Sequence, residues 1–302
     1  MEVNSMLGQH YLGIYEKAFP SDMSWEERFS AAKKLGFDYI ELSIDESDER
    51  LSRLDWTPKE AEALRHLAAE YELPFRSMCL SAHRRFPFGS EDEQIHTRAR
   101  EIMEKAIWLS ERLGIRVIQL AGYDVYYEKS TSASVRRFRA AMLWAAELAE
   151  QAQMMLGMEI MDTCFLNSIS KHMSYEAMIH SPWYRVYPDL GNLSAWPEND
   201  VEVELAQGIS SIVAVHLKDT LAVTDEFPGQ FKGVPFGSGC VDFAARFAQL
   251  ERLGYRGPYM MEMWHSGKTR DCAEIAAAKK WMEEQFRLGV SSLPDNCQRG
   301  CV

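Results

Sequence analysis

Apolar residues gather in short runs along the chain, and a longer segment with helical periodicity separates each run from the next. The runs cover residues 11–15, 39–44, 75–81, 116–121, 157–162, 184–190, 211–217 and 258–263. Apolar positions recur every three or four residues over 24–35, 58–72, 92–113, 133–153, 170–180, 199–208, 241–253 and 269–287. Runs that are apolar on both faces are typical of parallel strands covered by helices. The pattern therefore predicts strands and helices in strict alternation.

A recurring phrase marks where helices end and strands begin. It reads KLGFDYIEL at 34–42, RLGIRVIQL at 112–120 and RLGYRGPYMMEM at 252–263. Glycine is the usual residue after a helix end because it accepts the left-handed conformation, and a basic residue in the last turn suits the helix dipole. Sequences that fit the capping box, at Ser24–Glu27 and Thr57–Glu60, mark two helix starts. The same helix-to-strand junction is thus predicted at three points.

This alternation, repeated eight times in 302 residues, predicts a single (β/α)₈ TIM barrel. A doubly wound open sheet is the alternative, but such a sheet seldom needs so many units. Nothing in the composition marks a linker between domains, so we predict one catalytic domain over residues 1–288. Residues 289–302 are rich in Ser, Pro, Asn and Gly and are predicted to form a flexible tail.

The composition argues against several classes of protein. The formal net charge is −12, so the chain lacks the basic face with which proteins bind nucleic acid. No apolar run approaches the roughly 20 residues that span a bilayer, and the first residues do not resemble a secretion signal. The six cysteines show no regular spacing, which favours a reduced, cytoplasmic protein. Cys297 and Cys301 form a CxxxC pair in the predicted tail, where a frayed end is the simplest interpretation.

Ionisable residues stand late in four consecutive predicted strands. The words MEIMD, VYPDLGN, VAVHLKDT and MMEMW contribute Glu159, Asp189, His216 and Glu262. Active sites of (β/α)₈ barrels lie at the carboxyl ends of the strands, so these side chains are expected to converge on one half of the barrel mouth. Taken singly, Asp189 is better explained as a helix cap and His216 as a hydrogen-bonded core residue.

The two glutamates favour a shared partner instead. Burying a carboxylate among apolar neighbours is costly unless it is paired, and two such groups close together repel each other. A divalent cation would satisfy all four side chains at once. Three carboxylates and one imidazole form a hard-to-borderline ligand set, which favours Mn²⁺, Zn²⁺, Mg²⁺ or Co²⁺ over ions that prefer thiolates. We therefore predict one divalent metal ion at this place.

These residues carry a resemblance to a known family. The pattern of Glu159, Asp189, His216 and Glu262 resembles that of the xylose isomerase-like barrels. The longer words SMCLSAHRRFPFGSEDE, RVIQLAGYDVYYE, YPDLGNLSAW and IVAVHLKDT resemble the L-ribulose-5-phosphate 3-epimerases, also called L-xylulose-5-phosphate 3-epimerases or hexulose-phosphate isomerase-like proteins. The resemblance covers residues 9–288. It implies a divalent ion held by the four side chains, two glutamates that exchange a proton, a homodimer, and a role in pentose phosphate metabolism or ascorbate degradation.

The ligand set also suits this chemistry on its own terms. Epimerisation at C3 of a 2-ketose removes a weakly acidic proton beside the carbonyl group and returns it on the other face. A metal ion chelated by O2 and O3 acts as a Lewis acid and stabilises the enediolate. One carboxylate then serves as base and another as acid, from opposite faces of the sugar. Glu159 and Glu262 are predicted to flank the substrate in this way.

Further polar residues near the strand ends are candidates for contacts with a sugar phosphate. Gly237 and Ser238 precede a predicted helix, where backbone N–H groups bind anions in many proteins. The candidate charges and sugar contacts are Lys218, Lys232, His83, Arg84, Tyr123, Asn167, Asn192 and Trp196. A basic surface loop explains His83 and Arg84 equally well. Glu16, Lys17 and Glu41 are as readily explained as one another's partners, and residues 220–230 as a lid or a surface loop.

Four functions are compatible with such a barrel. The first is interconversion of L-ribulose 5-phosphate and L-xylulose 5-phosphate, and the second is epimerisation or isomerisation of another, unphosphorylated ketose. A non-catalytic sugar-phosphate-binding barrel is the third, but it predicts loss of one glutamate, and both are present. A DNA-repair endonuclease is the fourth. The acidic charge and Asn192, which stands where endonucleases of this superfamily carry histidine, argue against it.

Overall fold

A computed structural model describes residues 7–267 and 272–293, in which parallel strands form an eight-stranded sheet with the order β6-β5-β4-β3-β2-β1-β10-β7. The strands are β1 (Leu12–Tyr15), β2 (Tyr39–Ile44), β3 (Phe75–Leu80), β4 (Val117–Ala121), β5 (Met155–Glu159), β6 (Tyr184–Tyr187), β7 (Val215–Leu217) and β10 (Tyr259–Met261). Single-residue bridges, Val186 to Ile212 and Asp189 to His216, join the two ends of the sheet. The predicted (β/α)₈ barrel is confirmed.

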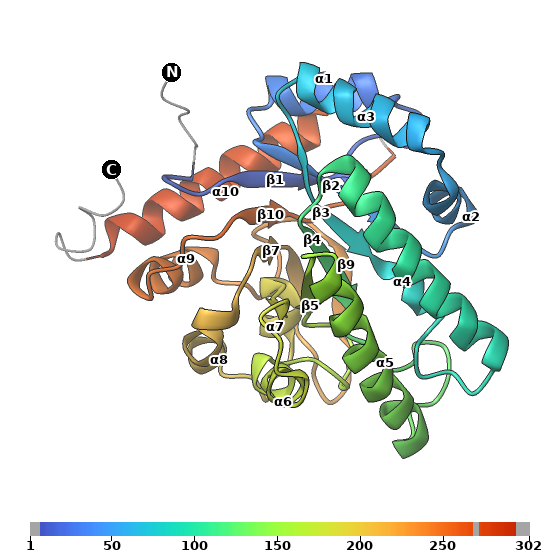
Figure 1. Cartoon of the computed structure of the whole chain (residues 1–302). Coiled ribbons are helices and arrows are strands. Elements are labelled where there is room, and N and C mark those ends of the chain that lie inside the picture. The colour runs from blue at the N-terminus through green and yellow to red at the C-terminus, as the bar shows by residue number, and fades with distance from the viewer. Residues whose placement is uncertain (1–6, 268–271, 294–302) are drawn as a thin grey trace.

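Helices cover the outside of the barrel (Figure 1). They are α1 (Trp25–Lys34), α2 (Asp48–Leu51), α3 (Pro58–Glu70), α4 (Glu93–Leu113), α5 (Ser132–Gln151), α6 (Ile169–Ile179), α7 (Leu190–Ala195), α8 (Val201–Gly208), α9 (Phe243–Arg252) and α10 (Ala273–Ser291). The strands are almost completely buried because helices pack on one face and interior side chains fill the other. Among the described residues, no helix is long and apolar enough to cross a membrane.

The helix signals of the sequence are realised in the backbone. Gly36, Gly114 and Gly254, the glycines of the recurring phrase, have φ angles of 73°, 77° and 78°. This left-handed conformation is nearly free of strain only for glycine, so it ends each helix before the next strand. The capping boxes at Ser24–Glu27 and Thr57–Glu60 are both complete. Local sequence therefore determines where these strands begin, and with them where the strand ends lie.

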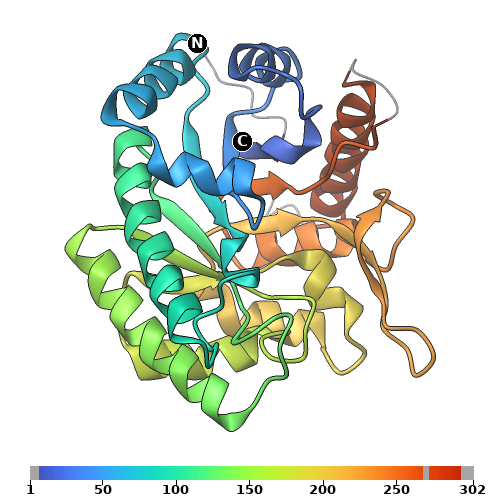
Figure 2. The same ribbon diagram turned by 90° about the vertical axis from the view of Figure 1, so that its right-hand side faces the viewer.

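Three features differ from the predicted elements. Residues 219–234 form a hairpin of β8 (Asp219–Leu221) and β9 (Gln230–Val234), which extends from the barrel at the right of Figure 2. The short helices α2 and α7 have too few turns to produce a periodic pattern in the sequence. Helix α10 runs to Ser291, so the predicted start of the tail at 289 falls inside a helix. Residues 294–302, with Cys297 and Cys301, lie outside the described residues.

Candidate metal centre and substrate pocket

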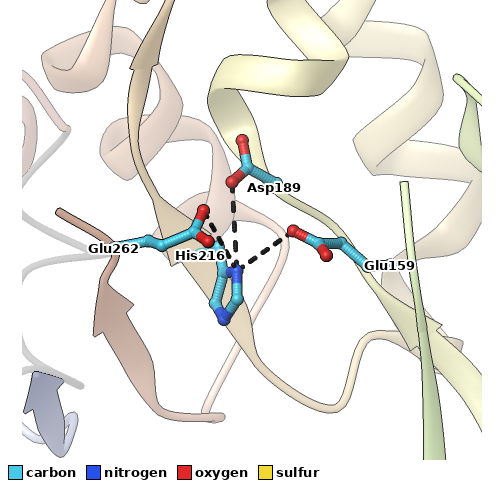
Figure 3. Close-up of side chains that lie close together, drawn as sticks. All are labelled: Glu159, Asp189, His216 and Glu262. Atoms are coloured by element: carbon cyan, nitrogen blue, oxygen red, sulfur yellow. Dashed lines mark hydrogen bonds and ion pairs between the residues drawn. The ribbon is translucent and has the colours of Figure 1, made fainter. Parts of the chain in front are cut away.

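Glu159, Asp189, His216 and Glu262 converge at the carboxyl ends of their strands (Figure 3). Glu159 ends β5, Asp189 follows β6, His216 lies within β7, and Glu262 follows β10. The His216 Nδ1 atom lies 3.2 Å from Glu159 Oε1, 3.7 Å from Glu262 Oε2 and 3.9 Å from Asp189 Oδ2. One donor atom from each residue lies within 4.8 Å of the others, and all four residues are buried.

The hydrogen bonding of this cluster leaves room for a cation. Asp189 Oδ2 and Glu262 Oε2 are buried, and apart from the Lys218 ammonium, whose Nζ atom lies 3.1 and 3.2 Å from them, they have no hydrogen-bond partner among the described residues. Three buried carboxylates that face one another repel, and the single charge of Lys218 offsets only part of that cost, so a cation between them would stabilise the cluster. Three carboxylate oxygens and one imidazole nitrogen suit a divalent ion of hard or borderline character. The residues present therefore fit the metal ion that the sequence predicts.

Glu41, on β2, contacts the ring nitrogen of His216 that faces away from the other three carboxylates. Its carboxylate lies 3.0 Å from His216 Nε2 and accepts hydrogen bonds from Ser77 Oγ (2.5 Å) and Tyr187 OH (3.2 Å). With a metal ion bound, a proton on Nε2 that is donated to Glu41 would leave the Nδ1 lone pair to the ion, as in the carboxylate–histidine pairs of metal sites. The sequence signal for Glu41 is the one that identified Glu159: a glutamate inside an apolar strand, here YIELSI.

Lys218 stands beside the cluster. Its Nζ atom lies 3.1 Å from Asp189 Oδ2 and 3.2 Å from Glu262 Oε2, and the residue is buried. Burial lowers the pKa of Lys218, but the negative charges of Asp189 and Glu262 outweigh it and raise the pKa above its ordinary value. Lys218 therefore carries a positive charge at the edge of the cluster. Lys218 is two residues after His216, so the alternation of side chains along an extended chain puts both on the same side.

The carboxylates differ in their affinity for protons. Burial raises the pKa of Asp189 from 3.8 to about 8, and burial also raises the pKa of Glu159. For Glu262, burial acts in the same direction, but Lys218 and His216 outweigh it and lower the pKa from 4.5 to about 2. Burial lowers the pKa of His216, whereas the charge of Glu41 and hydrogen bonds to Glu159 and Glu41 raise it well above 6.5. The carboxylates of the site thus stabilise positive charge on the groups next to them, His216 and Lys218.

A cavity of about 330 Å³ opens above the cluster. Glu159, Glu262, Asn192 and Lys218 lie along it, and Lys17, Arg84 and Lys232 add positive charge from the surrounding loops. Its other lining residues are Tyr15, Cys79, Ser81, Tyr126, Met161, Asp162, Gln230, Phe231 and Trp264. Larger hollows of about 580 and 510 Å³ elsewhere are not lined by these residues. Acidic groups at one place and basic groups at another suit a ligand that is itself polar at one end and anionic at the other.

Arg84 is held by an aromatic and acidic network that the sequence did not reveal. Its guanidinium lies 4.7 Å from the Tyr126 ring centroid and donates a 3.4 Å hydrogen bond to Tyr123 OH. The Tyr123 hydroxyl in turn hydrogen-bonds Asp162, which lines the cavity. Tyr123 itself supports Arg84 and Asp162 rather than lining the cavity. MEIMD contained the signal for Asp162, because this residue closes the same apolar word as Glu159.

His83, a predicted sugar contact, lies elsewhere. The 3-10 helix Ser81–Arg84 turns its side chain toward α4, where Nε2 lies 3.1 Å from the carbonyl oxygen of Ala99. The ring stacks on Phe88 with a centroid distance of 4.2 Å and is buried. His83 is therefore a core residue, and Arg84 is the member of the pair that lines the cavity.

Replacing His83 with Gln should make the protein less sensitive to acid. Burial lowers the pKa of His83 from 6.5 to about 4, so the unfolded chain binds a proton between these pH values and the folded chain does not. Neutral, buried His83 therefore makes its full contribution to the free energy of unfolding above pH 6.5. That contribution falls by about 3 kcal/mol as the pH falls to 4. Urea unfolding at neutral pH and at about pH 5 should differ less in His83→Gln than in the wild type. An equal difference in both proteins would contradict this assignment.

The predicted anion cradle at Gly237 and Ser238 is filled by the protein. Gly237 N–H donates a 2.9 Å hydrogen bond to Asp219 Oδ2, and Ser238 N–H donates a 3.0 Å bond to the carbonyl oxygen of Pro235. These N–H groups therefore already have acceptors. The sequence could not show this, because an anion and a buried aspartate make the same demand on a glycine-rich turn.

The remaining candidates, Asn192, Asn167 and Trp196, differ in their relation to the cavity. Asn192 lines it and donates from Nδ2 to the carbonyl oxygen of Ile160 (2.8 Å). Asn167 does not line the cavity, and its Nδ2 donates a 2.9 Å hydrogen bond to Glu198. Trp196 packs on Phe231 with a ring distance of 5.7 Å, so it supports a lining residue. The structure thus brings Arg84, Asn192, Lys218 and Lys232 to the cavity with the acidic cluster.

Comparison with known proteins agrees with this architecture. A family model described as "Xylose isomerase-like TIM barrel" matches residues 29–286. A protein named putative L-ribulose-5-phosphate 3-epimerase SgbU, from Escherichia coli, is 54% identical over 278 residues, which are 92% of this chain and 97% of that protein. L-ribulose-5-phosphate 3-epimerase UlaE, also from Escherichia coli, is 52% identical over 275 residues (91% and 94%). A solved L-ribulose 3-epimerase shares the fold, with a TM-score of 0.72 at 20% identity over 95% and 99% of the two chains.

Proposed function

This chain belongs to the xylose isomerase-like TIM barrel family, and from that premise we propose that it interconverts L-ribulose 5-phosphate and L-xylulose 5-phosphate through metal-dependent proton exchange at C3. The coarser activity, that of a carbohydrate epimerase, follows from relatives that are more than half identical over nearly the whole chain. One observation carries the finer proposal: two glutamates of a metal-competent cluster border the same cavity from different strands.

The proposed metal ligands are the atoms that face one another in the cluster, Glu159 Oε1, Asp189 Oδ2, His216 Nδ1 and Glu262 Oε2. A divalent ion bound there, Mn²⁺ or Zn²⁺ in our proposal, supplies a Lewis acid for the carbonyl and hydroxyl oxygens of the sugar, which lowers the cost of negative charge when C3 loses its proton. Lys218 Nζ lies next to Asp189 Oδ2 and Glu262 Oε2 and adds a fixed positive charge.

Glu159 and Glu262 are proposed to move the proton. Epimerisation needs a base on one face of C3 and an acid on the other. Glu159 ends β5 and Glu262 follows β10, so the two carboxylates border the cavity from different strands. The Gln119 side-chain amide donates to Glu159 Oε2 and so fixes the orientation of that carboxylate. The two groups are thus held in place before substrate arrives.

The basic side of the cavity favours a phosphorylated substrate over a free ketose. Arg84, Lys17 and Lys232 line it, and Arg84 is half-buried. Buried Arg84 Nε has no hydrogen-bond partner among the described residues, so the side chain retains a donor that the fold does not use. Arginine binds phosphate oxygens through its fixed fork of N–H groups. We propose that this side of the cavity holds the phosphate group and the acidic cluster holds the carbonyl end.

Replacing Arg84 with Met should raise KM for L-ribulose 5-phosphate about tenfold or more, because a charged hydrogen bond to phosphate is lost. The value of kcat/KM for unphosphorylated L-ribulose should change little. Arg85→Met is the matched control, since its neighbouring guanidinium is exposed and pairs with Asp48 at 2.7 Å. Equal losses with both sugars would contradict the proposed phosphate contact.

Steady-state assays with the two pentulose phosphates test the proposal as a whole. We expect formation of L-xylulose 5-phosphate from L-ribulose 5-phosphate, abolished by a chelator and restored by Mn²⁺ or Zn²⁺. Turnover of free L-ribulose alone would favour the unphosphorylated ketose. Binding of the sugar phosphate without turnover by the metal-loaded protein would favour a non-catalytic barrel.

A further inference from the structure

Asp219 is a buried carboxylate outside the metal cluster. The residue is 1% exposed and directly follows Lys218 in the chain. Its Oδ2 atom accepts hydrogen bonds from the backbone N–H groups of Gly237 and Gly239, both at 2.9 Å. Its Oδ1 atom accepts from Thr220 N–H at 3.0 Å and Val241 N–H at 3.4 Å. A single carboxylate thus binds the segment before α9 to the end of the β7 region.

This carboxylate also fixes the base of the β8–β9 hairpin. Asp219 is the first residue of β8 and pairs with Val234 of β9, and Gly237 follows that strand closely. Across the same turn, Cys240 N–H donates a 2.8 Å bond to the carbonyl oxygen of Thr220. Asp219 thus joins the turn before α9 to the residue that follows Lys218, beside the bond from Thr220 Oγ1 to the carbonyl oxygen of Gly191 (2.8 Å).

The hairpin contributes one wall of the cavity. Gln230, Phe231 and Lys232 of β9 all line it. Phe231 packs on Trp196, and Lys232 Nζ lies 4.8 Å from the ring centroid of Trp264. The residues of β9 are mostly exposed, so few buried contacts hold the strand in place. Besides the Phe231–Trp196 contact and the 2.7 Å bond from Val223 N–H to the carbonyl oxygen of Ala195, the base of the hairpin holds β9 in position.

The turn that contacts the Asp219 carboxylate has no space for a side chain at Gly239. A Cβ atom at Gly239 would lie 2.1 Å from Asp219 Oδ1 and 2.3 Å from the carbonyl oxygen of Thr220. Glycine is required because the backbone comes this close to the carboxylate. Asparagine has the shape of aspartate, but it carries no charge, and its NH₂ group cannot accept the bonds that one of the two oxygens accepts.

We propose that Asp219 is a positioning residue, which sets the affinity for the phosphorylated substrate by holding the β8–β9 hairpin and Lys232 against the cavity. The proposal rests on the proposed function, because it takes Lys232 as a contact of the sugar phosphate. It assigns Asp219 no contact with substrate or metal. Asp219 therefore acts on KM through Lys232, while the proton transfer at Glu159 and Glu262 continues.

The test compares Asp219→Asn, Lys232→Met and the double variant, with steady-state kinetics on L-ribulose 5-phosphate. Each single variant should raise KM about tenfold, and kcat should stay within about threefold of the wild type. The double variant should raise KM no further than Lys232→Met alone, since both changes remove one contact. Asp242→Asn is the matched control: this exposed aspartate caps α9 in the same loop, where asparagine caps equally well.

Limited proteolysis and metal binding give readouts that do not depend on turnover. Cleavage within residues 221–230 should be faster in Asp219→Asn than in the wild type and in Asp242→Asn, whereas Mn²⁺ affinity should be unchanged. Gly239→Ala, which displaces the same carboxylate, should reproduce both effects if Asp219→Asn is poorly folded.

Two results would overturn the inference in an active wild-type enzyme. The first is an unchanged KM and unchanged proteolysis in Asp219→Asn and Gly239→Ala. The second is additive effects of Asp219→Asn and Lys232→Met, which would show that Asp219 does not act through Lys232. Failure of the proposed function is a separate result, because the wild type would then not turn over the sugar phosphate at all.

Discussion

Glu159→Gln is expected to bind L-ribulose 5-phosphate while its proton exchange at C3 falls about 10³-fold, since general acid–base catalysis typically contributes 10² to 10⁴. Glutamine keeps the shape of the side chain and one oxygen toward His216 Nδ1, which lies 3.2 Å from Glu159 Oε1. It cannot accept the proton from carbon. The measurement is deuterium incorporation at C3 by proton NMR, with substrate affinity determined separately by calorimetry at saturating Mn²⁺.

Saturation with Mn²⁺ matters because Glu159 is also a proposed metal ligand, and a weaker metal site would by itself slow exchange. Glu101→Gln, on the exposed face of α4 and paired with Arg98, is a control for the chemical change alone. If metal-saturated Glu159→Gln exchanges C3 within about tenfold of the wild type, Glu159 is not the proton acceptor.

Glu41→Gln should weaken binding of Mn²⁺ about 10- to 100-fold, the range found when the carboxylate behind a metal-bound histidine is removed. In the wild type, Glu41 lies 3.0 Å from His216 Nε2 and favours the tautomer with its proton there. A glutamine amide can donate to Nε2 instead, which moves the proton to Nδ1 and aims it at Glu159, Asp189 and Glu262. Glu41→Gln therefore no longer stabilises the tautomer whose Nδ1 lone pair would bind the metal.

Titration of the chelator-treated protein with Mn²⁺, followed by electron paramagnetic resonance of the free ion, measures this effect without turnover. Ser77→Ala is a milder comparison, because it removes the 2.5 Å hydrogen bond to Glu41 but leaves the carboxylate. An affinity in Glu41→Gln equal to that of the wild type would show that Glu41 does not control the proposed ligand His216.

The sequence predicted the strand ends well because two independent signals locate them. The glycines of the recurring phrase end the helices at Gly36, Gly114 and Gly254, and the apolar runs fix the strands that follow. A barrel then leaves little choice about which ends meet. Glu159 and Glu262 could be identified because a carboxylate in an apolar strand requires a partner, whatever that partner is.

The sequence could not predict the direction in which a side chain points or the group with which it pairs. His83 and Arg84 are neighbours in one word, but a 3-10 helix turns one toward Ala99 and the other into the cavity. Asp219 fills the N–H cradle predicted for phosphate, although nothing in its sequence context distinguishes it from a residue of an ordinary turn. Hydropathy indicates that a group is buried, but its partner depends on long-range contacts such as the one between β8 and the turn before α9.

Proton NMR of L-ribulose 5-phosphate in D₂O with the Mn²⁺- or Zn²⁺-loaded enzyme tests the central claim most directly. We predict that deuterium enters at C3 as L-xylulose 5-phosphate forms, that C1 retains its protons, and that a chelator stops both changes. Exchange at C1, which is the mark of an aldose–ketose isomerase, or no exchange at either carbon would contradict a metal-dependent 3-epimerase.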